Sequence, residues 1–148
     1  MRELKAGKLA MSLMFLLFAV GNGFCDNVDS ESWTLLQEGL FINEKSLSRS
    51  GDNTVSLWIV MVPEEGSELM YEARSHLMED GKEYQALKYD YTGFMSEIDC
   101  SRKRYRELMT IMYDVNKNIV HSVETSPASW KDISPESSLE VVVAAVCN

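Results

Sequence analysis

The chain has 148 residues, of which 45% are hydrophobic and 25% are charged, and its formal net charge is −9. This length fits one domain, and the composition excludes a disordered chain or a fibrous repeat. The acidic excess excludes generic binding to the phosphate backbone of nucleic acids and to anionic lipid surfaces, because both would repel it.

The first 25 residues have the pattern of a secretory signal peptide. Three basic side chains within residues 1–8 precede an apolar run over residues 9–20, and small residues then lead to Cys25. The apolar run is too short to cross a membrane core, which needs about 20 apolar residues. We therefore expect a signal peptide over residues 1–25 and no integral membrane span in the mature protein. An uncleaved anchor or a buried helix would also fit this pattern.

Cleavage before Asp26 would remove Cys25. Lipidation of Cys25 is the alternative, and we disfavour it because a lipoprotein site needs a small residue where this chain has Phe24. The mature part then keeps 11 basic and 22 acidic side chains and two cysteines, Cys100 and Cys147. In an oxidising compartment an even pair favours a disulfide, which would contribute about 3–5 kcal/mol by closing a long loop. Two buried free thiols are the alternative.

The first half of the mature chain predicts strands followed by a helix. After a polar lead-in over residues 26–32, residues 33–37 and 40–42 indicate a hairpin, and residues 54–62 alternate as a half-buried strand that Pro63 ends. Apolar spacings of three and four then predict an amphipathic helix, with Ser67 as its N-cap and Gly81 just past its end. Its apolar stripe comprises Leu69, Met70, Ala73, His76 and Leu77.

The second half predicts three more strands and a terminal helix. The strands are expected over residues 89–99, 104–113 and 119–123, while residues 84–88 are ambiguous and residues 124–133 form a loop. Ser134, Pro135 and Glu136 have the order of a cap, a first-position proline and a first-turn acid, so they are expected to open the helix. Its stripe comprises Leu139, Val142, Val143 and Val146. We predict an α+β fold with a mainly antiparallel sheet of about six strands.

A series of short motifs runs in order through the mature chain. They are Trp33, residues 57–60 (LWIV), 97–100 (EIDC), 104–106 (RYR), 113–114 (YD), 119–122 (IVHS), Trp130, residues 133–137 (ISPES) and Cys147. With these motifs the chain resembles the surface-adhesin protein E-like domain family of Gram-negative envelope proteins, over nearly all of residues 33–148. The resemblance implies a small antiparallel sheet with a C-terminal helix tied by the cysteine pair, and the helix predicted after Pro63 would be an insertion in this sheet. It also implies export and, in some members, adhesion to host extracellular-matrix and serum proteins.

The candidate partner-binding residues are basic or aromatic. The basic run from Arg102 to Arg106 would place Arg102, Arg104 and Arg106 on one strand face, with Tyr105 interleaved on the other. It suits an acidic partner, although a solvated sheet face would have the same sequence. Two tryptophans, Trp58 and Trp130, are interface candidates because aromatic anchors dominate protein contacts. Packing under the helices is the alternative for both.

Enzymatic and metal sites have less support. Glu97 and Asp99 alternate on one strand face, as a hydrolytic carboxylate pair would, but solvated acids at a strand end look the same. His76 and His121 have no partner at ligand spacing, so we expect no metal site and no cofactor. The sequence also has no P-loop, HExxH, GxSxG or dinucleotide-binding motif.

We therefore expect an exported, non-enzymatic protein of the periplasm, the outer envelope or the extracellular space. It would act as an adhesin-like binding or assembly module with unidentified protein partners, a second copy of itself among them, and without catalytic residues. The alternative is a periplasmic accessory hydrolase that uses the carboxylates of Glu97 and Asp99.

Overall fold

The computed structural model describes residues 32–148. The expected signal peptide, the cleavage before Asp26, the disfavoured lipidation of Cys25 and all of the lead-in except Ser32 lie outside these residues. The strands are β1 (Trp33–Gln37), β2 (Leu40–Asn43), β3 (Ser48–Arg49), β4 (Thr54–Met61), β5 (Tyr89–Asp99), β6 (Arg104–Asp114), β7 (Ile119–Glu124) and β8 (Lys131–Asp132). The helices are the short 3-10 turn η1 (Glu44–Ser46), α1 (Glu68–Glu79), α2 (Glu83–Lys88) and α3 (Ser138–Val146).

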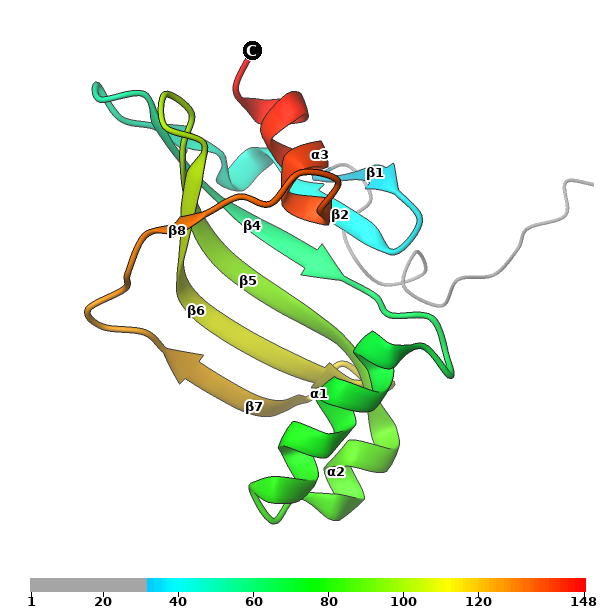
Figure 1. Cartoon of the computed structure of the whole chain (residues 1–148). Helices are drawn as coiled ribbons and strands as arrows, with labels where there is room; N and C mark the ends of the chain where they lie inside the picture. The colour runs from blue at the N-terminus through cyan, green and yellow to red at the C-terminus, as the bar shows by residue number, and fades with distance from the viewer. Residues whose placement is uncertain (1–31) are drawn as a thin grey trace, which may run out of the picture.

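The sheet is antiparallel, with the order β1-β2-β4-β5-β6-β7, and the short β3 and β8 pair with β4 and β6 (Figure 1). The α1–α2 insertion connects β4 to β5, and α3 follows the last strand. The predicted fold class is confirmed, including the inserted helix and the terminal helix. Antiparallel neighbours joined by short turns need no crossover, which is why most of the sheet follows the order of the sequence.

One face of the sheet, which we call the inner face, packs against α3. Because side chains alternate along a strand, Val55, Leu57 and Ile59 of β4 all point to this face. Val142 and Val146 of α3 pack on them, and both helix residues are buried. Fully burying each such aliphatic side chain contributes about 1.5–3 kcal/mol, so this core holds α3 on the sheet although valine is a poor helix former.

The α1–α2 insertion packs on the same face at the other end of the strands. Met70 and Leu77 of α1 are buried with Ala86 of α2 and with Met112 of β6. Met112 lies on the inner face because the ladder aligns Met61, Thr92 and Met112 in one row across the sheet.

The predicted ends of α1 agree with the structure. The Ser67 Oγ accepts the Met70 N–H at 3.2 Å, and Gly81 follows the helix with a φ of 70°. The stretch that was ambiguous in the sequence forms α2.

The start of α3 and the loop before it differ from the prediction. The helix begins at Ser138, and Glu136, which was expected in its first turn, has a φ of 61° that no α-helix contains. The Ser137 Oγ instead donates to the Ser134 carbonyl at 2.6 Å, so the expected cap sequence forms a separate turn. Within the expected loop, β8 pairs with the first residues of β6.

A disulfide joins Cys100, in the turn between β5 and β6, to Cys147 at the C-cap of α3, as predicted. The two Cα atoms are 5.5 Å apart. The bond therefore fastens the end of α3 to the sheet beneath it. Within residues 32–148, no helix combines the length and the apolar character that crossing a membrane requires.

Candidate binding surface

The opposite face of the sheet, which we call the outer face, carries aromatic, methionine and arginine side chains. Across β4, β5 and β6 the register aligns Trp58, Met95 and Met109 in one row. All three side chains are half-buried, so each keeps part of its surface accessible. This row forms the apolar middle of the outer face.

Trp58 lies over a glycine in the neighbouring strand. A Cβ atom built on Gly93 would lie 3.7 Å from Trp58 Cζ3 and 3.7 Å from Tyr113 Cε2, so the two rings meet above the bare backbone. Because Trp58 belongs to the face opposite α3, the alternative that it packs under a helix is wrong. An aromatic ring over a strand glycine compensates for the missing side chain and keeps the strand ordered.

A pair of stacked tyrosines extends the outer face toward the α1–α2 end. The rings of Tyr91 and Tyr113 have centroids 4.7 Å apart and an interplanar angle of 14°. Tyr91 is buried in a cluster with Phe41 and Val60, against which Trp33 also packs. Burial, followed by the neighbouring Tyr113, raises the pKa of Tyr91 to about 12, so its hydroxyl stays neutral at physiological pH.

At the other end of the outer face, two arginines stack on a tryptophan. The guanidinium carbons of Arg106 and Arg104 lie 4.6 Å and 5.6 Å from the ring centroid of Trp130. Trp130 is half-buried and comes from the segment just before β8, which pairs with the start of β6. Arginine over a tryptophan face gains a cation–π attraction and is held in place by it.

The two carboxylates that would serve a hydrolase are paired with these arginines. Glu97 forms an ion pair with Arg106, and Asp99 lies 3.3 Å from both Arg104 Nη2 and Arg102 Nη1. Asp99 also accepts the Arg102 backbone N–H at 2.9 Å, and this hydrogen bond, with the two arginine side chains, lowers the pKa of the Asp99 carboxyl. An acid held ionised in this way cannot act as a proton donor near neutral pH.

The basic run is split between a turn and two faces. Arg104 and Arg106 share one strand face as predicted, and this is the outer face. Arg102, which was expected on the same strand face, belongs instead to the turn before β6, and its side chain is 72% exposed. Tyr105 points to the inner face, where it packs against the core beneath α3 and has the Lys131 ammonium 5.8 Å from its ring centroid. The aromatic partner of the arginines is thus Trp130, which sequence spacing did not indicate.

An apolar hollow lies on the inner face between α3 and the middle of the sheet. Its lining includes Leu40, Ile59, Met61, Phe94 and Leu139. Ser138 at the start of α3 also lines this hollow, which therefore lies beside the first turn of the helix.

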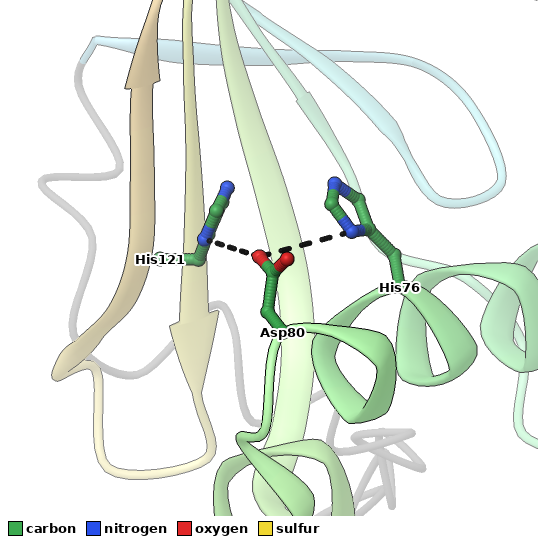
Figure 2. Close-up of side chains that lie close together, drawn as sticks. All are labelled: His76, Asp80 and His121. Carbon is green, nitrogen blue, oxygen red and sulfur yellow. Dashed lines mark ion pairs between the residues drawn. The ribbon is translucent and has the colours of Figure 1, made fainter.

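The two histidines meet at one place, which the sequence did not indicate. Figure 2 shows His76 of α1 and His121 of β7 on either side of Asp80, whose carboxylate lies between the two imidazoles. The sequence analysis found no partner for either histidine at ligand spacing, and it overlooked Asp80, four residues after His76. The contact of Asp80 with His121 of β7 could not be recognised from spacing. Burial, then the Lys82 ammonium, lowers the pKa of His121.

The comparisons with known proteins give one family and one fold. The family model of surface-adhesin protein E matches residues 33–148. Among solved structures, crystal form II of Haemophilus influenzae protein E matches with a TM-score of 0.51 and 11% identity, covering 78% of this chain and 87% of that one. A second structure of Haemophilus influenzae protein E has a TM-score of 0.50 and 11% identity, with 78% and 83% covered. No curated protein matches the sequence.

Proposed function

The chain belongs to the surface-adhesin protein E family, and from this premise we propose that it is an exported, non-enzymatic envelope protein that binds a host protein through the outer face of its sheet. The observation that carries the proposal is the half-exposed row of Trp58, Met95 and Met109. Together with the Arg106–Trp130 stack, it offers the side chains that are enriched in the centres of protein interfaces.

The charges around this row favour a partner that makes apolar contacts. The arginines on the outer face are already paired with Glu97 and Asp99, so they contribute little free positive charge. Their planar guanidinium groups remain able to donate hydrogen bonds at the rim of a contact. A protein surface with exposed aliphatic or aromatic side chains fits this arrangement better than a polyanion does.

The carboxylates support a binding role over the hydrolase alternative. Glu97 and Asp99 serve as ion-pair partners that hold the arginines on the outer face. The lowered pKa of the Asp99 carboxyl favours its ionised form, whereas a general acid has to carry a proton. We therefore assign these acids to the architecture of the surface.

Export is supported by the signal pattern of residues 1–25 and by the disulfide between Cys100 and Cys147, since such bonds persist in oxidising compartments. We propose cleavage before Asp26, loss of Cys25 without lipidation, and a mature protein in the periplasm or at the outer surface. The intact mass of the exported protein tests this, with and without reduction. The expected mass is that of residues 26–148 less two hydrogen atoms, and a lipid adduct would contradict it.

Binding is tested with the purified mature protein on surfaces coated with individual extracellular-matrix and serum proteins. Replacing a central aromatic anchor costs about 2 kcal/mol or more, so Trp58→Ala should weaken binding by roughly thirtyfold. The matched control is Tyr71→Ala, which removes a 73% exposed aromatic side chain from α1, away from the outer face. The proposal fails if the wild-type protein binds none of the coated proteins, or if Tyr71→Ala weakens binding as much as Trp58→Ala does.

A further inference from the structure

Three side chains with metal-ligating atoms converge where the end of α1 meets β7. His76 lies in the last turn of α1, Asp80 is its C-cap residue, and His121 projects from β7 (Figure 2). The Asp80 Oδ2 is 3.4 Å from His121 Nδ1 and 3.9 Å from His76 Nδ1. One ligand atom from each residue lies within 4.8 Å of the other two.

These separations suit a small tetrahedral cation. Zinc holds nitrogen and carboxylate oxygen ligands at about 2.1 Å, which places neighbouring ligand atoms about 3.4 Å apart. The Asp80–His121 separation already has this value. The side chains of His76 and Asp80 are 59% and 39% exposed, so small rotations of these two can close the remaining gap. His121 is only 12% exposed in its side chain and supplies the fixed ligand.

A cation already occupies part of this space. The Lys82 Nζ lies 2.8 Å from His121 Nδ1, so the ammonium donates a hydrogen bond to the same nitrogen that faces Asp80. An ammonium at this nitrogen requires a neutral imidazole with its lone pair directed into the site. The lone pair of neutral imidazole is also what binds a metal, so Lys82 and a metal ion compete for it.

We propose that His76, Asp80 and His121 form a site for a divalent transition-metal cation of the zinc type, which displaces the Lys82 ammonium when it binds. Two imidazole nitrogens and one carboxylate oxygen would serve as ligands, and water would take the fourth position. This set favours zinc, nickel or copper over magnesium and calcium, which prefer oxygen ligands. The metal would join the α1–α2 insertion to the edge strand of the sheet. This metal site is separate from the proposed binding surface on the outer face, since the site lies on the inner face.

The experiment titrates untagged, metal-free mature protein with zinc chloride in a calorimeter. The wild-type protein should bind one zinc ion per chain, and magnesium chloride should give no comparable heat. Losing a metal ligand costs at least as much affinity as losing a supporting residue, so His76→Gln, Asp80→Asn and His121→Gln should each weaken binding by roughly tenfold or more. Lys82→Gln should strengthen it, because the competing ammonium is gone.

Glu79→Gln is the matched control, since it removes the same charge as Asp80→Asn from the neighbouring exposed position. It should bind zinc as the wild type does. A second readout is thermal stability, because a ligand that binds only the folded state raises the melting temperature. At the same zinc concentration, zinc should raise it for the wild type and for Lys82→Gln, and should raise it by less for His76→Gln, whose substitution lies at an exposed position. The proposal would be overturned if neither the wild type nor Lys82→Gln bound zinc. It would also be overturned if Glu79→Gln lost as much zinc affinity as Asp80→Asn.

Discussion

Asp99, the last residue of β5, faces Arg104, the first residue of β6, across the ladder, and the Asp99 Oδ2 lies 3.3 Å from the Arg104 Nη2. The same carboxylate accepts the backbone N–H of Arg102 and so closes the turn between the two strands. This turn also contains Cys100, which anchors α3. One buried acid therefore supports the turn, the disulfide anchor and the arginine that stacks on Trp130.

The first prediction concerns acid stability. Because its folded-state pKa is lowered, Asp99 contributes stability that is fully present above its unfolded-state pKa, near 3.8, and is lost as the pH falls through the folded-state value. Asp99→Asn should lower the free energy of unfolding at pH 7 and flatten its decline below pH 4, as measured by urea denaturation at several pH values. Asp132→Asn, at an exposed position of β8, should change neither the unfolding free energy at pH 7 nor its decline below pH 4. If both variants gave the same unfolding free energies across this pH range, the role of Asp99 would be contradicted.

The second prediction concerns the stack on the outer face. With the Arg106 guanidinium 4.6 Å from the Trp130 ring, a double-mutant cycle with Arg106→Gln and Trp130→Leu should give a coupling energy of about 0.5–1 kcal/mol. The measurement is the free energy of unfolding of the four proteins in urea. A parallel cycle that combines Trp130→Leu with Glu72→Gln, at an exposed position of α1 and so at the other end of the strands, should give a coupling energy near zero. Additive effects in the first cycle would show that the stack contributes nothing.

The third prediction concerns the disulfide. Cys100 and Cys147 are 47 residues apart, and closing a loop of this length restricts the unfolded chain by about 4 kcal/mol at 25 °C. The double variant Cys100→Ser, Cys147→Ser should lose about 2–4 kcal/mol of unfolding free energy in urea. A reducing agent should destabilise the wild type to the same extent and leave the double variant unchanged. A wild type that is indifferent to reduction would contradict the expected contribution.

Sequence patterns predicted the secondary structure correctly where it is determined by residues close together in the chain. The alternation in β4 and the Ser67 and Gly81 ends of α1 depend on neighbours within a few residues, and both appear in the structure. The start of α3 was placed too early because Ser134 to Ser137 satisfy their own backbone in a turn that has the composition of a helix cap. A two-residue strand such as β8 has no periodicity that could be recognised in advance.

The arrangement of the site residues was likewise predictable only where it depends on local sequence. The face of Arg104 and Arg106 could be predicted from the strand period, because alternation is a local property. Their contact with Trp130, and that of Asp80 with His121, depend on segments that only the sheet brings together. The sequence left Asp99 as either part of a hydrolytic carboxylate pair or a solvated acid at a strand end. Its arginine partner depends on the register of β5 and β6, which a single sequence does not specify.

The last prediction concerns the turn between β1 and β2. Gly39 has a φ of 71°, and a Cβ atom there would collide with the backbone carbonyl oxygen of Val62, while the Val62 N–H donates to the Gly39 carbonyl at 2.7 Å. Gly39→Ala should therefore destabilise the protein by more than about 1 kcal/mol, since both the left-handed conformation and the contact oppose a side chain. Gly51 has no atom within 4 Å of such a Cβ and no positive φ, so Gly51→Ala should be neutral or stabilise by about 0.4–1 kcal/mol. Urea denaturation of both variants measures the contrast. If Gly39→Ala and Gly51→Ala had equal unfolding free energies, the hairpin would have to shift away from Val62 at no cost. The contact between Gly39 and Val62 would then not fix the edge of the sheet.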